Sequence, residues 1–320
     1  MLVSILFLFA PIFSLQGELP AQGETPVANA EDPVRWVASE LWVADAEFVV
    51  SLTITAPADG MQLPLWALTG AAFDLNGKAL GERPKGMIAL APGQVVETRF
   101  DLTASIGALA PKGTFTLACA IPGSGEPIEV LSPQPLANKV DFMEIPVSEL
   151  AGFEVIMLTN RGAMWFELWP DVAPNHVRNF LDLSSSGFYD GSHFHRVVPG
   201  FMIQGGGAPP GKTAPRKVKA EFNSRKHGAG ILSAARLGND INSATSQFFV
   251  MHRNYPSLNG RYSPFGKLKS GMEVVEKIVI TGDPRYSSNT PQGFTPTTPQ
   301  NILRAIVVRA QSTVGEDGDK

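Results

Sequence analysis

Two short stretches of the sequence bring together an arginine, large apolar side chains and amides. The first runs from Phe194 to Gly206 and the second from Ser246 to Val250. Their chemically useful members are Arg196, Phe201, Met202, Gln204, Gln247 and Phe249. An arginine is always charged and presents five N–H groups in a rigid fork, while aromatic rings and methionine supply apolar surface. This combination predicts a site that holds an apolar group beside a fixed hydrogen-bond donor, without a covalent step.

Strand alternation supports the grouping in the second stretch. Gln247 and Phe249 point to one side of a strand, and Phe248 points to the other. Arg196 taken alone would be a surface residue with a packed stem and a solvated head. Its function is inferred from its companions, because glutamine amides beside it can both donate and accept hydrogen bonds.

Two other patterns suggest different chemistry, and each fails on its context. Gly206–Thr213 satisfies the phosphate-loop pattern, but Pro209 and Pro210 have no N–H with which to cradle a phosphate. We interpret this match as chance. His193 and His195 share a strand face but have no third ligand at useful spacing, which favours a structural role. No G-x-S-x-G or H-E-x-x-H pattern is present, so hydrolase chemistry lacks a nucleophile or a metal.

From Phe153 to Val308, about half of the chain, the sequence resembles the cyclophilin family of peptidyl-prolyl isomerases. The resemblance rests on the two stretches above and on Gly230–Ala235, which follow one another in family order. It implies an antiparallel β-barrel with a helix over each end. The positions matched to catalytic residues are Arg196, Gln204 and Phe201, and those matched to substrate-binding residues are Met202, Ala235, Gln247, Phe249, Leu258 and Tyr262. No cofactor or metal is implied.

The implied reaction is the cis–trans flip of an Xaa-Pro bond, over a barrier of ~18–20 kcal/mol that comes from amide resonance. In the twisted amide the prolyl nitrogen becomes pyramidal and gains a lone pair. A donor fixed beside that nitrogen therefore stabilises the transition state more than the ground state, which is the kind of binding that accelerates a reaction. Arg196 is the natural donor, with Phe201, Met202 and Phe249 as the floor under the proline ring.

The sequence departs from the family pattern at three places. Ser257 stands where many cyclophilins have tryptophan, which should weaken the binding of cyclosporin-like ligands more than catalysis. Tyr262 replaces a frequent histidine and can still wall the pocket. The loop from Gly207 to Glu221 carries four basic residues, namely Lys212, Arg216, Lys217 and Lys219. This loop is either simply solvated or a basic rim that favours acidic residues upstream of the proline.

Composition bounds the remaining interpretations. The chain has 320 residues, a net charge of −4 and one cysteine, Cys119, so it has no disulfide framework, and its bulk charge gives no reason to expect nucleic-acid binding. Residues 1–17 form a candidate signal peptide, because the sequence is apolar from Leu2 to Leu15, which is shorter than a membrane span. Export to a bacterial periplasm or cell envelope is predicted, and an uncleaved N-terminal anchor is the alternative.

The chain is predicted to be mainly β. A flexible leader covers residues 18–32, and a β-sandwich-like domain of unknown role covers 33–131, with no convincing helix. In that domain one strand face is predicted to carry Phe48, Val50, Leu52 and Ile54, and a hairpin turn is predicted at Asn76-Gly77. The three tryptophans are interpreted as core residues or, alternatively, as a binding surface; they are Trp36, Trp42 and Trp66. A linker covers 132–149, the cyclophilin-like domain 150–310, and a loose polar tail 311–320.

Within the second domain, two helices are predicted. One begins at Pro174 and ends before Gly187, and the other begins at Ser270 with a capping-box pattern. Residues 284–300 are expected to form a long loop. The predicted function is isomerisation of Xaa-Pro bonds in unfolded or partly folded exported proteins, without nucleotide. The alternative is a non-catalytic module or chaperone that binds proline segments and docks through the N-terminal domain.

Overall fold

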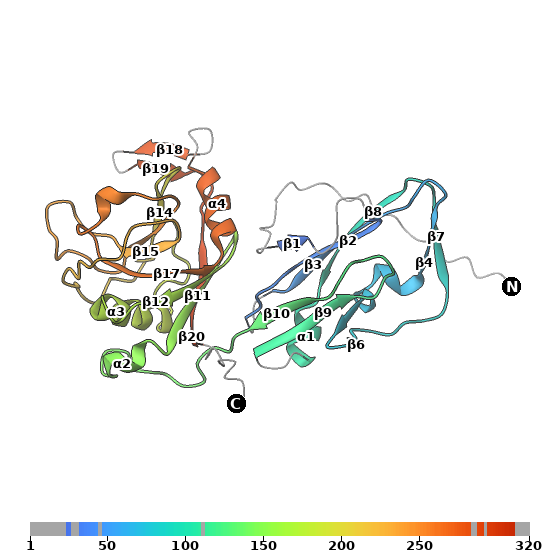
Figure 1. Ribbon diagram of the computed structural model, residues 1–320, viewed down its shortest axis with the longest axis horizontal. Helices are drawn as coiled ribbons and strands as arrows, with labels where there is room; N and C mark the ends of the chain where they lie inside the picture. Colours follow the sequence, from blue (N-terminus) through green and yellow to red (C-terminus); the bar gives the residue numbers. More distant parts are fainter. Residues whose placement is uncertain are drawn as a thin grey trace, which may run out of the picture.

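The computed structural model describes residues 24–26, 32–43, 47–109, 113–282, 287–290 and 293–310. The predicted signal peptide (1–17), most of the leader (18–32) and the tail (311–320) lie outside these residues. The described chain is mainly β, as predicted, and forms two bodies side by side that are joined by the segment after Ser132 (Figure 1).

The N-terminal body is built on two four-stranded sheets that share one apolar core. The first sheet has the order β1-β2-β3-β8, with bounds Glu24–Pro26, Val34–Ser39, Val49–Thr55 and Val95–Asp101. The second has the order β10-β9-β5-β6, with bounds Ile128–Ser132, Gly113–Cys119, Phe73–Leu75 and Lys78–Ala79. The further elements are β4 (Met61–Pro64) paired with β7 (Met87–Leu90), the short 3₁₀ helices η1 (Leu65–Leu68) and η2 (Gly70–Ala72), and α1 (Thr103–Leu109).

Local sequence signals explain much of this body. The four alternating residues of the Phe48–Ile54 stretch are at most 1% exposed, as the period-2 pattern predicts. The Asn76-Gly77 turn is confirmed: both residues have positive φ, 49° and 77°, between β5 and β6. Trp36 and Trp42 are buried core residues, which confirms the interpretation preferred for them, and Trp66 packs against the same core but is only partly buried.

The prediction that this body has no helix is wrong. α1 follows β8 directly, and the Asp101 carboxylate accepts a hydrogen bond from the Thr103 N–H at its start. Thr103 Oγ1 in turn accepts from the Phe48 N–H, while Ile106 is the only buried member of the helix. A seven-residue segment with one core residue shows little 3.6-residue periodicity, so tertiary contacts determine this helix.

The C-terminal body is one curled eight-stranded sheet of order β13-β14-β16-β15-β17-β12-β11-β20. The strand bounds in that order are Arg196–Val198, Met202–Gly205, Phe248–Met251, Ile231–Ala234, Pro264–Ser270, Gly162–Leu168, Phe153–Thr159 and Ile302–Arg309. The helices are α2 (Val147–Leu150), α3 (Pro174–Ser185), α4 (Met272–Ile280) and the 3₁₀ helix η3 (Pro256–Leu258). α3 begins and ends as predicted, and its stripe of Val177, Phe180 and Leu181 is buried in the core inside the sheet.

Two predictions for this body need correction. Ser270 does not cap α4: it ends β17, and Gly271 occupies the N-cap with φ 100° and no side-chain hydrogen bond. Glycine is required there, because a Cβ would lie 2.5 Å from the Ala163 carbonyl oxygen. The expected loop between residues 284 and 300 contains a hairpin, β18 (Ser287–Thr290) paired with β19 (Gly293–Pro296).

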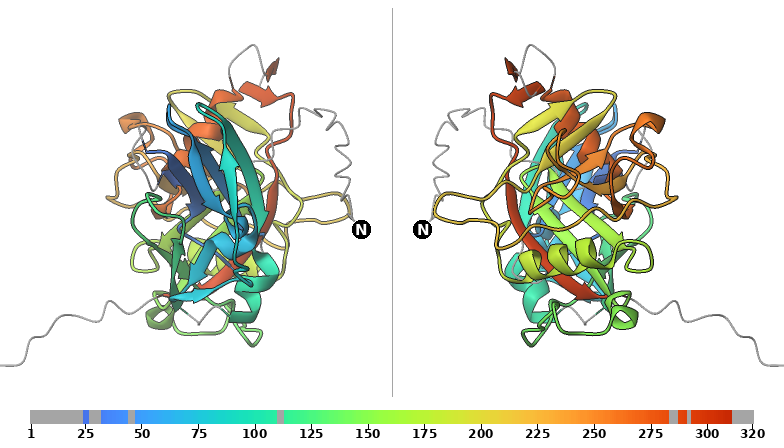
Figure 2. Two further views of the ribbon diagram at one scale, coloured as in Figure 1. Left: turned by 90° about the vertical axis from the view of Figure 1, so that its right-hand side faces the viewer. Right: turned by 90° about the vertical axis from the view of Figure 1, so that its left-hand side faces the viewer.

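The outer face of the curled sheet carries two separate apolar clusters. We call the first the groove cluster; its members are Trp169, Met202, Ile231, Ala235, Phe249, Met251 and Leu258. We call the second the interface cluster; its members are Val43, Ile156, Trp165, Ile306 and Val308. Val43 comes from the N-terminal body, and Leu41 and Leu131 from that body also pack against the interface cluster. The N-terminal body therefore covers the outer face of β11, β12 and β20, and it lies behind the curled sheet in the right-hand view of Figure 2.

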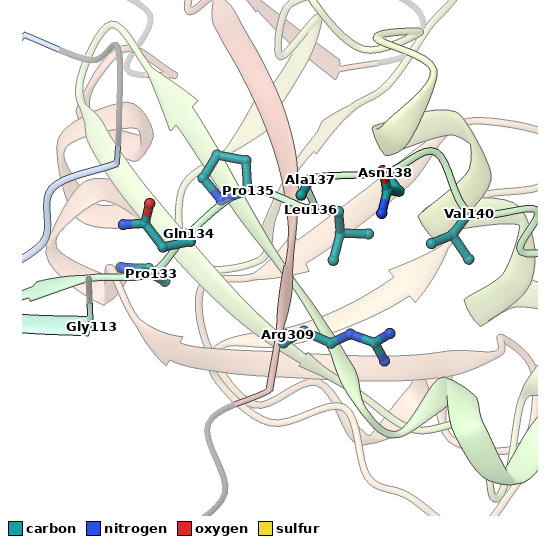
Figure 3. Close-up of a pocket in the computed structure, with 9 residues that line it drawn as sticks. All are labelled: Gly113, Pro133, Gln134, Pro135, Leu136, Ala137, Asn138, Val140 and Arg309. Atoms are coloured by element: carbon teal, nitrogen blue, oxygen red, sulfur yellow. The ribbon is translucent and has the colours of Figure 1, made fainter.

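The segment predicted as a linker packs against the C-terminal body. Leu136 N–H donates to Val307 O on β20, and Phe142 is fully buried against Phe153, with ring centroids 5.0 Å apart. A cavity of about 460 Å³ lies beside this segment, where Pro133–Val140 passes the side chain of Arg309 (Figure 3).

Candidate functional site

Strand register brings three of the predicted site residues into one row. Arg196 on β13 lies opposite Gln204 on β14, and Gln204 lies opposite Phe249 on β16. Residues opposite one another project from the same face of a sheet. All three therefore lie on the outer face, whereas Phe248 points into the core inside the sheet, as alternation predicts.

A single cavity of about 190 Å³ collects eight of the nine predicted residues. They are Arg196, Phe201, Met202, Gln204, Ala235, Phe249, Leu258 and Tyr262. The ninth, Gln247, lies beside the cavity: its Oε1 accepts from Gln204 Nε2 at 3.0 Å. The apolar floor consists of Met202, Phe249 and Leu258, each less than one-tenth exposed. Tyr262 meets Phe249 edge to face, with ring centroids 5.6 Å apart.

Arg196 is half-buried at the edge of this floor. Its Cζ lies 5.8 Å from the centroid of the Phe201 ring, and its Nη1 donates to Gln204 Oε1 over a long 3.4 Å. Its Nε is buried and has no partner in the described part of the chain. Burial lowers the pKa of Arg196, although an arginine still keeps its charge at neutral pH. The guanidinium therefore brings an under-used set of donors to an apolar cavity.

The turn that carries Phe201 is held by a buried histidine. His252 Nδ1 accepts from the Gly200 N–H at 2.9 Å, and the His252 N–H donates to Phe201 O at 2.9 Å. With Nδ1 acting as an acceptor, Nε2 carries the proton and donates to Glu276 Oε2 at 2.8 Å. His252 and Glu276 could not be recognised from the sequence, because they lie in different elements and meet only in the folded chain.

A second buried histidine supports the floor from behind. The His227 ring stacks on Phe249, with centroids 6.1 Å apart and planes at 21°. His227 is 2% exposed, and its Nε2 lies 3.1 Å from Ser233 Oγ on β15. Burial lowers the pKa of His227, which keeps the ring neutral and suited to stacking.

The basic loop after Gly207 is bound to α3 and does not line the cavity. Arg216 pairs with Asp182 at 2.7 Å, and Lys212 Nζ donates to Gly187 O. Further along, Glu221 accepts from the N–H groups of Asn175 and His176 in the first turn of α3. Burial raises the pKa of Glu221, but these bonds and the His176 ring outweigh it and hold that pKa below its usual range. None of the four basic loop residues lines the cavity, and two of them, Lys212 and Arg216, are bound at α3 and its end.

One cavity residue was missed by the sequence analysis. Arg236 directly follows Ala235, and its Cζ lies 4.6 Å from the centroid of the Tyr262 ring. The neighbouring resemblance at Gly230–Ala235 was the available signal. What the sequence could not show is that Arg261 and Tyr262, which follow η3, contact the Arg236 side chain and hold it at the cavity.

The remaining sequence features lie elsewhere. Ser257 is exposed on η3. The rings of His193 and His195 lie 6.2 Å apart, and the backbone of His193 forms an isolated β-bridge with Asn301. Cys119 is partly exposed at the end of β9.

Comparison with known proteins agrees with this geometry. A family model described as cyclophilin type peptidyl-prolyl cis-trans isomerase/CLD matches residues 154–304. Peptidyl-prolyl cis-trans isomerase B of Bacillus subtilis is 43% identical over 128 residues, which are 38% of this chain and 87% of that protein. The isomerase ppi1 of Schizosaccharomyces pombe is 36% identical over 161 residues, 48% of this chain and 98% of its own.

Among solved structures, a cyclophilin type isomerase of Cryptosporidium parvum, crystallised in the presence of the dipeptide Ala-Pro, is 32% identical. The match covers 49% of this chain and 99% of that one, with a TM-score of 0.43. The chain belongs to the cyclophilin-type peptidyl-prolyl cis-trans isomerase family. Its C-terminal body is a cyclophilin-type peptidyl-prolyl cis-trans isomerase domain. These relatives match only the C-terminal body.

Proposed function

We propose that the cavity holds a proline ring against Met202, Phe249 and Leu258 while Arg196 donates to the prolyl nitrogen as the amide twists. The observation that carries this proposal is the Arg196 guanidinium, whose Nε is buried without a partner at the edge of an apolar cavity. A donor already desolvated and fixed in place needs no reorganisation when the nitrogen gains its lone pair. No covalent bond breaks, so the chain needs no nucleophile.

In this proposal the two glutamines are positioning and backbone-binding groups. Gln204 accepts from Arg196 and donates to Gln247, so its amide is oriented by both neighbours. The Gln204 carbonyl oxygen keeps the guanidinium near the floor, and Gln247 retains N–H groups that can bind the substrate backbone. Loss of Gln204 is therefore expected to reduce the rate without abolishing binding.

The test is cis–trans exchange of a short Ala-Pro peptide, measured by NMR exchange spectroscopy, because this needs no coupled protease. Arg196→Ala should slow the catalysed exchange by ~10²–10³-fold, the usual effect of removing one preorganised donor. Arg304→Ala, which removes an exposed arginine on β20, is the matched control and should leave exchange unchanged. Wild-type exchange in a folded Arg196→Ala variant contradicts the mechanism. Peptide binding without exchange in the wild type would instead favour the proline-binding module.

We also propose that the substrates are exported polypeptides. The support is the apolar sequence from Leu2 to Leu15, which lies outside the described residues. In the described part of the chain, no helix is long and apolar enough to span a membrane. Cell fractionation with N-terminal sequencing tests the proposal. A cleaved protein in the envelope fraction supports it, and a full-length protein confined to the cytosol overturns it.

A further inference from the structure

The cavity contains a second guanidinium, that of Arg236, which carbonyl oxygens hold in place. Arg236 Nε and Nη2 donate to Arg261 O at 3.2 and 3.0 Å, and Nη1 donates to Leu237 O at 2.8 Å and to Gly238 O at 3.3 Å. The Tyr262 ring packs on one face of the group. With five N–H groups and these four bonds, one Nη2 hydrogen has no acceptor in the described part of the chain.

The charge on this group is not neutralised. Three other arginines of the C-terminal body are paired with carboxylates, namely Arg216 with Asp182, Arg225 with Asp171 and Arg253 with Glu276. Within the described residues neither Arg196 nor Arg236 has a carboxylate within salt-bridge distance, and none of the nine residues lining the cavity is acidic. Two positive charges therefore share one partly desolvated cavity, where electrostatic interactions are stronger than in bulk water.

The size of the cavity limits how far Arg236 is from a bound proline. A volume of about 190 Å³ corresponds to a sphere about 7 Å across, or about two residues of extended chain. A substrate residue one or two positions away from the bound proline can thus bring its side chain to the Nη2 group of Arg236.

The charge of the whole domain has the same sign. Residues 150–310 contain 18 Lys and Arg against 10 Asp and Glu, a formal charge of +8, whereas residues 1–149 contain 7 against 17, a charge of −10. The net charge of −4 conceals this asymmetry. A basic catalytic domain raises the local concentration of acidic chain segments and speeds their encounter with the cavity.

We propose that Arg236 selects proline segments that carry Asp or Glu within two residues of the proline. This inference rests on the proposed function of the cavity, and it replaces the basic loop with a single specificity-determining side chain. A substrate carboxylate would supply the charge that Arg236 lacks and accept from its remaining Nη2 hydrogen.

The experiment compares alanine-based peptides of one length that contain one central proline. Each peptide carries a single Glu at one of the two positions before or the two positions after the proline, and each has a Gln counterpart. Exchange is measured at sub-saturating peptide. The wild type should process at least one Glu peptide about fivefold faster than its Gln partner, the scale of a partly exposed ion pair, and added salt should shrink this ratio. Arg236→Gln should bring the ratio to about one. Arg261→Gln removes a charge from the adjacent exposed arginine that does not line the cavity and should keep the ratio.

The outcomes separate this inference from the mechanism. If the wild type catalyses exchange of an all-Ala peptide but shows no preference for Glu, the role of Arg236 is overturned and the proposed role of Arg196 stands. If the wild type catalyses exchange of no peptide, the proposed function itself is overturned. A preference that survives in Arg236→Gln also overturns the inference. If Arg236→Gln does not fold, Arg236→Lys, which keeps the charge, must retain part of the preference, and the salt response of the wild type remains an independent measurement.

Discussion

The groove cluster and the interface cluster occupy the same outer face of one curled sheet, but only the interface cluster is covered by the N-terminal body. Both clusters come largely from strands that have apolar residues on the inner and on the outer face of the sheet. Full exposure of either outer cluster to water would therefore be unfavourable. The interface cluster is closed by Val43 and its neighbours from the N-terminal body, whereas the groove cluster lines an open cavity. What distinguishes the groove is the polar row beside it, where the buried Nε of the charged Arg196 has no partner in the described part of the chain.

On the interface side the charged groups are paired with one another, although the buried Trp165 Nε1 has no hydrogen-bond partner in the described part of the chain. Lys269 Nζ lies 2.8 Å from Glu154 Oε1 and 4.6 Å from the centroid of the Trp165 ring, next to the covered surface. Apolar surface by itself therefore does not mark a site in this protein. Apolar surface next to an under-bonded charge does.

The largest expected effect on the interface side comes from Val43→Asp. Val43 is 1% exposed, and none of the surrounding Ile156, Trp165 and Ile306 side chains carries a positive charge that could neutralise a carboxylate placed there. We expect the N-terminal body to detach or the protein to lose ~3–5 kcal/mol of stability. Proteolysis in the segment after Ser132 should accelerate, as measured by limited digestion, while exchange per folded molecule stays at the wild-type rate. If the variant loses exchange while its digestion matches that of the wild type, the interface cluster also contributes to catalysis and the distinction between the two clusters is wrong.

The next effect is on the groove side. Phe249→Ala removes the ring that forms the floor and meets both Tyr262 and His227. Loss of the contact between this ring and the substrate is expected to lower the exchange rate by about 10²-fold, since burying one large apolar side chain is worth ~1.5–3 kcal/mol. Ile306→Ala, of the interface cluster, is the control: it should reduce stability but not exchange. The two rates are compared in one NMR experiment.

The contacts of Glu221 with the first turn of α3 should make the stability of the protein depend on pH in the acid range. The folded pKa of Glu221 is depressed, so its contribution to stability is present above its unfolded value of about 4.3 and is lost as pH falls through the folded value. Glu221→Gln should therefore flatten the decline of the melting temperature below about pH 5. Equal acid sensitivity of variant and wild type, in parallel melting curves, would show that other carboxylates determine it.

The smallest effect is expected from Glu276→Gln. The carboxylate is on the surface of α4 and orients His252, which in turn holds the turn of Gly200 and Phe201. An amide can still accept from His252 Nε2, so we expect a loss of about twofold in exchange, the scale of an exposed pair. His252→Ala, which removes both contacts to the turn, should cost clearly more; the ranking is checked at one peptide concentration.

Local signals made part of this structure predictable. The Asn76-Gly77 turn, the start of α3 at Pro174 and the buried face of β3 each depend on a few neighbouring residues. The row of Arg196, Gln204 and Phe249 could be anticipated because alternation and the family resemblance agree on it. The domain boundaries and the roles of the site residues stay predictions.

What the sequence did not reveal depends on contacts between distant segments. α1 starts at the side chain of Asp101 and is anchored to Phe48, far away in the chain. Gly271 replaces the expected cap because the backbone of Ala163 passes too close for any side chain. The roles of Arg236 and His252 could be assigned only from the folded chain, because they depend on where the segments after β15 and β16 lie relative to the cavity.

The most direct test measures exchange and unfolding together for Arg196→Ala and Trp165→Ala, one variant from each side of the sheet. The account predicts that Arg196→Ala loses ~10²–10³-fold of the exchange rate at nearly wild-type stability. It predicts that Trp165→Ala loses ~3–5 kcal/mol of unfolding free energy and keeps its exchange rate per folded molecule. Wild-type exchange in Arg196→Ala, or lost exchange in folded Trp165→Ala, would contradict the division of the outer face into a catalytic groove and a docking surface.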